Sequence, residues 1–118
     1  MKIWVDDIRP APDGYVWCKS VFEFQMFYSH KLDEIELIDL DHDAGEYAVE
    51  FGDYIEILNW LDKWYNDYLD YHEKNDDQLS VSLAQVISKI KFRFHSANPV
   101  GVANMRRIIE RNGWEEVK

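Results

Sequence analysis

The sequence contains little cysteine, no long apolar run and few positive charges. Its one cysteine, Cys18, excludes an internal disulfide and suits the reducing cytoplasm. No apolar run approaches the roughly 20 residues that cross a bilayer. The first residues, Met1 to Trp4, are followed at once by two aspartates, which is unlike a signal peptide. We therefore expect a cytoplasmic protein that has no membrane partner.

The shortage of positive charge limits the partners that the chain can have. Thirteen Lys and Arg residues stand against 23 Asp and Glu residues, which gives a formal net charge of −10. Lys and Arg supply most of the affinity for nucleic-acid backbone, so an extended nucleic-acid-binding surface is not expected. A small phosphorylated ligand is still compatible with this charge, because a bound cation inverts the local field. The sequence leaves the oligomeric state open.

The residues that are present predict one folded domain over positions 1–118. Hydrophobic residues make up 47% of the chain and aromatic residues 15%, and there is no repeat or long linker. Short apolar runs predict strands at 2–5, 15–18, 35–40, 90–94 and 114–117. Helical spacing and capping residues predict helices at 21–30, 52–71 and 99–111. Residues 72–78 are expected to form an exposed connection, and residues 83–89 fit either a helical turn or a strand. This alternation predicts an α/β fold with a mainly parallel sheet.

Polar residues follow three of the predicted strands at the point where each strand ends. Asp6-Asp7 follows the first strand, Asp41-His42-Asp43 follows the strand at 35–40, and His95-Ser96 with Asn98 follows the strand at 90–94. The carboxyl ends of parallel strands meet at one edge of a sheet, where ligand sites form. These residues therefore predict a single convergent site.

Four aspartates in this set are candidate metal ligands: Asp6, Asp7, Asp41 and Asp43. Two carboxylates about 4 Å apart repel by roughly 4 kcal/mol at an effective dielectric constant near 20. Such a cluster either retains a proton or binds a cation. Oxygen ligands favour Mg²⁺ or Mn²⁺. In the alternative interpretation, only one or two of the carboxylates point inward and the others cap loops.

The histidines and the following turn are candidates for proton transfer and anion binding. An imidazole can exchange a proton near neutral pH, so His42 and His95 are candidates for base and acid, although a lone histidine is more often a packing or hydrogen-bonding group. Ser96, Asn98 and Gly101 form a strand-to-helix turn, where backbone N–H groups and the helix dipole attract anions. Asn98 is also a good N-cap for the last helix.

Three motifs together resemble the cyclic-phosphate processing receiver domain family, a branch of the response-regulator receiver fold. They are Ile3-Trp4-Val5-Asp6-Asp7-Ile8-Arg9-Pro10-Ala11-Pro12, Leu40-Asp41-His42-Asp43-x-Gly45 and His95-Ser96-Ala97-Asn98-Pro99-Val100-Gly101-x-x-Asn104-Met105. The resemblance implies a three-layer, receiver-like (flavodoxin-like) α/β fold with about four to five strands and helices on both faces. It implies a cyclic phosphate on a nucleotide or an RNA end as the substrate.

The resemblance also implies roles for individual residues. Asp6 and Asp7 match the receiver's acidic pair that binds Mg²⁺, Asp41 its phosphoacceptor and Ser96 its hydroxyl residue. His42 and His95 belong to the cyclic-phosphate branch. Two positions depart from the pattern. Ala44 stands where a larger apolar residue is expected, and the receiver's late lysine has no match, since Lys118 is the only lysine after Ser96.

The sequence thus predicts a metal-assisted phosphoesterase. The expected catalytic residues are Asp41, His42 and His95, the expected metal ligands are Asp6, Asp7, Asp41 and Asp43, and the expected phosphate-binding residues are Arg9, Ser96, Asn98 and Gly101. Which histidine is the acid stays open, as does the possibility that Asp41 is a nucleophile. The alternatives are a non-catalytic receiver-like module that senses a phosphate ligand or protein partner, and an acidic face that only mediates interaction.

Overall fold

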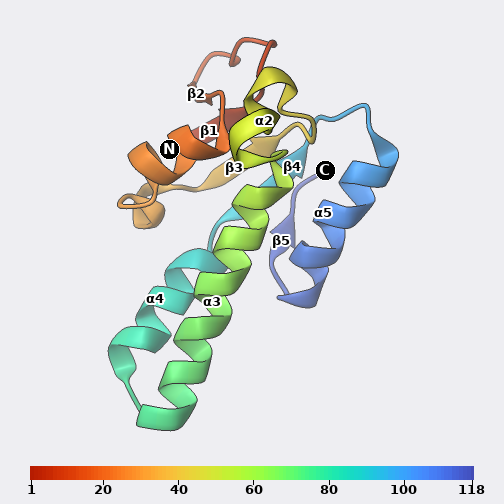
Figure 1. The fold of residues 1–118 in the computed structure, drawn as a ribbon. Helices are drawn as coiled ribbons and strands as arrows, with labels where there is room; N and C mark the ends of the chain where they lie inside the picture. Colours follow the sequence, from red (N-terminus) through yellow and green to blue (C-terminus); the bar gives the residue numbers. More distant parts are fainter.

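Five parallel strands form one sheet in the computed structural model, which describes residues 1–118 (Figure 1). The strands are β1 (Lys2–Val5), β2 (Tyr15–Cys18), β3 (Leu37–Leu40), β4 (Lys91–Phe94) and β5 (Glu115–Glu116). Their order across the sheet is β2-β1-β3-β4-β5. This is the flavodoxin-like order, and it confirms the α/β receiver-like class.

Two predicted strands are shorter than expected. The strand predicted at 35–40 begins at Leu37, because residues Leu32–Glu34 form a 3₁₀ turn that ends at Ile35. The last strand is only Glu115–Glu116 and pairs with the first half of β4. The other three strands are present, and β2 pairs along its whole length with β1.

The first helix is short and ends earlier than predicted. Helix α1 (Val21–Glu23) continues as a π-helical turn over Phe24–Tyr28. The Ser20 hydroxyl accepts a hydrogen bond from the Glu23 N–H at 3.0 Å, and the Glu23 carboxylate accepts one from the Lys19 N–H at 2.9 Å. These bonds satisfy free N–H groups at the helix start, as expected from the Ser-x-x-Glu pattern.

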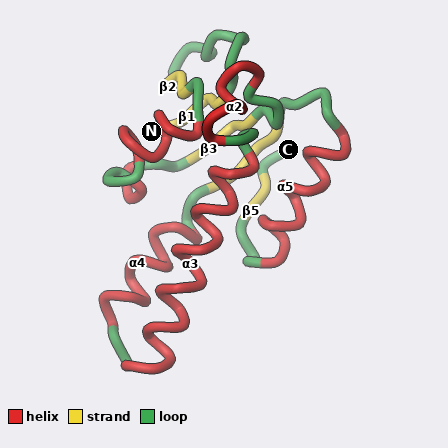
Figure 2. Tube along the Cα trace, in the orientation of Figure 1, coloured by secondary structure: helices red, strands yellow, loops and turns green.

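The segment between β3 and β4 differs most from the sequence prediction. It contains α2 (Ala48–Phe51), α3 (Ile55–Asn75) and α4 (Gln78–Ser88), and α3 and α4 form a hairpin that projects beyond the sheet (Figures 1 and 2). The predicted connection at 72–78 is too long: α3 continues to Asn75, α4 begins at Gln78, and the chain reverses at Asp76, which has a left-handed φ of 50°. Adding residues to an existing helix costs little free energy compared with nucleating a new one, and the Asp70–Lys74 pair at 3.0 Å stabilises the last turn of α3.

The last helix matches its prediction. Helix α5 (Pro99–Arg111) begins after Asn98, whose side-chain oxygen accepts a hydrogen bond from the Gly101 N–H at 2.9 Å. Pro99 occupies the first helical position, where its missing N–H costs nothing. The chain turns back to β5 at Gly113, which has a φ of 69°.

The two faces of the sheet have different surroundings. Ile3, Ile38 and Phe92 are in register and fully buried, and they share one hydrophobic core with residues of α1, α3, α4 and α5. The connections after β2, β3 and β4 all cross the sheet in the same direction, so right-handed crossovers place their helices on this face (Figure 1). The β1–β2 connection, by contrast, is the loop 6–14 and contains no helix. The second face of the sheet thus carries no helix of this chain.

No helix combines the length and the apolar character needed to cross a membrane.

Candidate functional site

The strand register brings three of the predicted residues to one edge of the sheet. Val5, Leu40 and Phe94 are aligned on β1, β3 and β4, and each is followed by a polar residue: Asp6, Asp41 and His95. Backbone bonds continue past the strands, because the Asp41 N–H donates to Val5 at 2.9 Å and the His95 N–H to Leu40 at 3.0 Å. The site therefore rests on rigid backbone rather than on free loops.

Asp6 lies at the centre of this edge and is almost fully buried. One carboxylate oxygen accepts the N–H groups of Ile8 and Arg9, both at 2.9 Å, and the other accepts Arg9 Nε at 2.8 Å and His95 Nε2 at 2.9 Å. Burial raises the pKa of Asp6, but the backbone N–H groups, then His95 and the Arg9 charge, outweigh burial and hold this pKa below its ordinary value. Asp6 is thus ionised and already supplied with four donors.

Asp7 and Asp41 complete an acidic cluster with Asp6. Ligand oxygens of the three carboxylates lie within 4.8 Å of one another. Burial, together with the negative charges of Asp6 and Asp41, raises the pKa of Asp7. The Asp7 carboxylate lies against the Cα of Gly45, whose φ is 56°, so a side chain at position 45 would displace it.

This donor set fits a hard divalent cation. Asp7 accepts no hydrogen bond from another residue's side chain or backbone, whereas Asp41 accepts the His42 N–H at 2.7 Å and faces Arg9. Carboxylate oxygens of this kind are the preferred ligands of Mg²⁺ and Mn²⁺. The repulsion that raises the pKa of Asp7 is what a bound cation would relieve.

Arg9 bridges two of these carboxylates from the loop after β1. Its Nε lies 2.8 Å from Asp6 and its second terminal nitrogen 3.2 Å from Asp41. Half of the Arg9 side chain remains exposed, at 51%. The guanidinium therefore presents N–H groups both to the acidic cluster and to the space above it, where an anion would bind.

His95 is fixed between two buried acids. Nε2 lies 2.9 Å from Asp6 and Nδ1 lies 2.7 Å from Asp39, and the ring stacks on Trp4 with centroids 3.7 Å apart. In this arrangement His95 has no free ring nitrogen and acts as a donor to two carboxylates.

Asp39 is a site residue that sequence reasoning missed. It is 2% exposed and also lies 3.9 Å from Arg93. Its sequence signal is an acid within an otherwise apolar strand, at a position that alternation directs away from the core. Trp4 of β1, the register partner of Asp39, lies on the same face of the sheet, and it was likewise assigned from the sequence only to a strand.

His42 has a different setting. Its Nδ1 lies 2.7 Å from Asp43, and its ring lies on the Cα of Gly101, in the space that a side chain would fill. Asp43 accepts the Nδ1–H, and this hydrogen bond lowers the pKa of Asp43 despite the opposing effect of burial. Nε2 makes no hydrogen bond within the protein, so it is the one ring nitrogen of the two candidate histidines that is free to exchange a proton.

Asp43 therefore lies apart from the acidic cluster. It groups with His42 and Asp53, whose possible ligand atoms lie within 4.8 Å of one another. Asp53 was not singled out from the sequence; its carboxylate accepts the Ala44 N–H at 3.0 Å and so holds the turn after Asp43.

The strand-to-helix turn uses its own side chains as partners. The Ser96 hydroxyl accepts the Asn98 N–H at 3.1 Å, and Asn98 caps α5 through Gly101. The Asn98 amide nitrogen lies 3.3 Å from Asp43, which places its donor beside the His42–Asp43 pair. Lys118, the only lysine after Ser96, lies 3.2 Å from Glu116 and makes no ion pair with Asp41.

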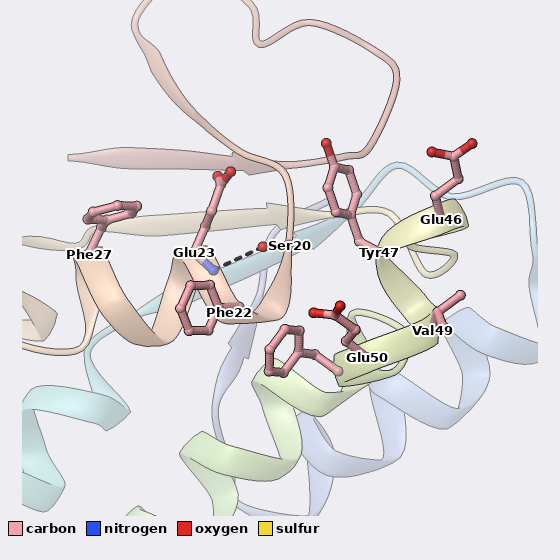
Figure 3. Close-up of a pocket in the computed structure, with 9 residues that line it drawn as sticks. Ser20, Phe22, Glu23, Phe27, Glu46, Tyr47, Val49 and Glu50 are labelled. Atoms are coloured by element: carbon pink, nitrogen blue, oxygen red, sulfur yellow. Dashed lines mark hydrogen bonds between the residues drawn. The ribbon is translucent and has the colours of Figure 1, made fainter.

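A cavity of about 760 Å³ lies away from these residues, between α1 and α2 (Figure 3). Phe22 and Phe51 stack there with ring centroids 5.1 Å apart, and three glutamates line the cavity. The lining residues are Ser20, Phe22, Glu23, Phe27, Glu46, Tyr47, Val49, Glu50 and Phe51. None of the predicted catalytic, metal or phosphate-binding residues is among them, so this cavity is separate from the strand-end site.

Comparison with protein families gives one match, to a model described as "Cyclic-phosphate processing Receiver domain", over residues 1–111. Comparison with curated proteins gives no match, and comparison with solved structures gives none. The family match covers every strand-end residue described above.

Proposed function

Because the chain belongs to the cyclic-phosphate processing receiver domain family, we propose that it is a metal-assisted phosphoesterase that opens a cyclic phosphate. The family match confirms the resemblance that the three motifs indicate. The observation that carries the proposed reaction is the His42–Asp43 pair, with a free Nε2, one residue from Asp41 in the acidic cluster.

The acidic cluster would bind the cation. Asp7 and Asp41 would supply the oxygen ligands, while Asp6, whose four acceptor positions are filled, would contribute its charge. When bound, Mg²⁺ would supply neutralisation of the phosphoryl oxygens. His95 and Asp39 would fix Asp6, and through it Arg9, so His95 is a positioning residue in this proposal.

His42 is the proposed general base. Asp43 accepts a hydrogen bond from Nδ1–H, which keeps the proton of the neutral ring on Nδ1. Nε2 therefore has a free lone pair, which accepts a proton from the attacking water. The new phosphorus–oxygen bond forms as the bond to one ribose oxygen breaks. The released ribose oxygen takes a proton from solvent, and the product is a phosphate monoester. Arg9 and the Asn98 amide, with their exposed donors, would bind the phosphate oxygens.

One observation favours a second candidate, a receiver-like module that binds a phosphate ligand without hydrolysing it. Arg9 already balances the charges of Asp6 and Asp41 without a metal. In that case the ligand would compete with these carboxylates for the guanidinium. The loop 6–14, which contains Arg9, would then change its conformation, and a partner protein would recognise that change.

Turnover of a 2′,3′-cyclic mononucleotide with Mg²⁺ separates the two candidates. We expect the wild type to form a phosphate monoester, and Asp41→Asn and His42→Ala to lower kcat at least about 100-fold, the usual contribution of a general base. Exposed Asp33→Asn and His30→Ala are the matched controls and should retain the wild-type rate. Ligand binding without product in the wild type would favour the second candidate.

A further inference from the structure

The helix-free face of the sheet carries aromatic and basic side chains beside the proposed catalytic edge. In the register of the sheet, alternate positions on β1, β2, β3 and β4 point to this face. These positions hold Lys2, Trp4, Tyr15, Trp17, Leu37, Asp39, Lys91 and Arg93. Of these, only Asp39 is fully buried, so the rest of the face is accessible.

Three aromatic rings lie next to one another on β1 and β2. Trp4 meets Tyr15 edge-on with centroids 6.0 Å apart, and Trp17 is the register partner of Trp4. Two of these rings have a lysine ammonium group over them: Lys2 Nζ lies 5.7 Å from the Tyr15 centroid and Lys19 Nζ 4.4 Å from that of Trp17. Lysine chains are flexible, so a flat ring can replace them and leave the ammonium groups free for a phosphate.

The charge of this face contrasts with that of the whole molecule. The chain has a net charge of −10, yet five of its 13 basic residues lie on this face or at its rim: Lys2, Arg9, Lys19, Lys91 and Arg93. The nearby acids are Asp6 and Asp41, which pair with Arg9, and Asp39, which lies 2.7 Å from His95. The exposed Glu36 and Glu115 lie 3.9 and 3.6 Å from Lys2 and Lys91. Exposed pairs of this length contribute little. Lys2, Lys19 and Lys91 thus have no buried acid as a partner and can turn to an anionic ligand with flat rings.

The aromatic rings connect directly to the acidic cluster. Trp4 donates from its indole N–H to the Arg9 carbonyl at 2.9 Å, and Trp17 donates to the Asp6 carbonyl at 2.8 Å. The other side of Trp4 stacks on His95, which binds Asp6. A ligand bound on the rings would therefore lead into the phosphate position at Arg9.

We propose that this face binds the nucleotides that precede the cyclic phosphate, so that the substrate is the end of a single-stranded RNA rather than a free cyclic nucleotide. The proposal rests on the proposed function, since it places the cyclic end at the strand edge. A 2′,3′-cyclic phosphate requires a ribose 2′-hydroxyl, so the strand is RNA. Aromatic rings on an open sheet face stack single-stranded bases without requiring a particular sequence.

Stacking would supply the affinity, because the overall charge opposes the RNA backbone. Three rings accommodate about two or three bases, with Lys2 and Lys19 released to the phosphates between them. Two phosphate contacts predict that log Kd rises with log salt by only about 1.4. A surface that depends on many phosphate contacts would show a much steeper dependence.

The test compares a tetrauridylate that ends in a 3′-phosphate with uridine 3′-monophosphate, both measured by quenching of tryptophan fluorescence in the full chain. The tetrauridylate should bind at least about fivefold more tightly, which corresponds to one stacked base. Tyr15→Ala and the pair Lys2→Glu with Lys19→Glu should remove most of this difference. Tyr71→Ala on α3 and Lys31→Glu, both exposed and distant from the face, are the matched controls and should retain it.

The corresponding kinetic ratio, kcat/KM for a cyclic-ended tetrauridylate over that for the cyclic mononucleotide, should fall in the same variants. Equal binding of the two ligands, or a ratio that Tyr15→Ala does not change, would overturn this proposal while the mononucleotide reaction still stood. If neither cyclic substrate is turned over and neither phosphate ligand binds, the proposed function and the proposed RNA-binding face are both wrong.

Discussion

At the scale of single residues, Gly101 determines where His42 can lie. The His42 ring occupies the space of a Cβ at position 101, so Gly101→Ala must push the ring away from Asp43. Alanine raises helix propensity by about 1 kcal/mol, whereas overpacking costs about 1–3 kcal/mol, so we expect a net loss of stability. Urea unfolding should show this loss, and turnover should fall because His42 is displaced.

A double-mutant cycle isolates this contact. In a His42→Ala background the clash is gone, so Gly101→Ala should stabilise the protein by up to about 1 kcal/mol. If Gly101→Ala destabilises both backgrounds equally, the contact with the His42 ring is not the reason why position 101 requires glycine.

His95 makes a second prediction at this scale. His95→Phe retains a ring for Trp4 to stack on, but it removes one of the four donors of Asp6 and the hydrogen bond to Asp39, and both acids are almost fully buried. We expect a loss of about 3 kcal/mol in the free energy of unfolding, partly recovered by Asp39→Asn in the same chain. If stability is unchanged and only turnover falls, then His95 is a proton carrier and not a positioning residue.

The residues at the strand ends could be predicted from the sequence, but their partners could not. Asp6, Asp41 and His95 follow short apolar runs, and that local pattern suffices to place them at one edge. Whether His42 or His95 has a free nitrogen depends on Asp39 and Gly101, which lie 56 and 59 positions away from the histidines they contact. Such contacts follow from the packing of the sheet and α5, which no local pattern encodes.

At the scale of elements, the bounds of a helix could be predicted where strong capping and stop signals mark its ends. Asn98-Pro99 and Asn112-Gly113 bound α5 in the sequence as in the structure. The α3–α4 hairpin was missed in part because residues 72–78 are polar and resemble a loop, whereas the helix continues through them. The helix-free face was not foreseen, because the resemblance implies helices on both faces, although Pro10 and Pro12 already disfavour a helix in the loop 6–14.

The cap of α5 makes a prediction at the element scale. Asn98→Ala removes the acceptor of the Gly101 N–H and should lower the free energy of unfolding by about 1 kcal/mol. Ser96→Ala, which loses a bond only within the turn, is the neighbouring control and should cost less. Hydrogen exchange at the first turn of α5 should increase in Asn98→Ala. Equal effects of the two substitutions would contradict the capping assignment.

At the scale of the whole molecule, Asp7 couples stability to pH and to metal. Its pKa is raised in the folded protein by burial and by the charges of Asp6 and Asp41, so the folded state binds the extra proton. The metal-free protein should therefore lose stability as pH rises from the ordinary Asp pKa of 3.8 through this raised pKa. Above it, Asp7→Asn should melt at a higher temperature than the wild type.

Mg²⁺ should reverse the order of these two melting temperatures, so that the wild type melts above Asp7→Asn. A ligand that binds only the folded state at 100 times its Kd stabilises it by about 2.7 kcal/mol, so the Tm of the wild type should rise with millimolar Mg²⁺. Asp7→Asn should lose most of that rise, and Asp33→Asn, exposed and distant, should keep it. The same rise in Asp7→Asn as in the wild type would place the cation elsewhere.

The ³¹P spectrum of a 2′,3′-cyclic mononucleotide, incubated with stoichiometric protein and Mg²⁺, tests the central claim most directly. The account predicts that the cyclic-phosphate resonance is replaced by that of a phosphate monoester, and that His42→Ala slows this conversion at least about 100-fold while remaining folded. A cyclic resonance that persists unchanged beside folded wild-type protein would contradict catalysis at this site.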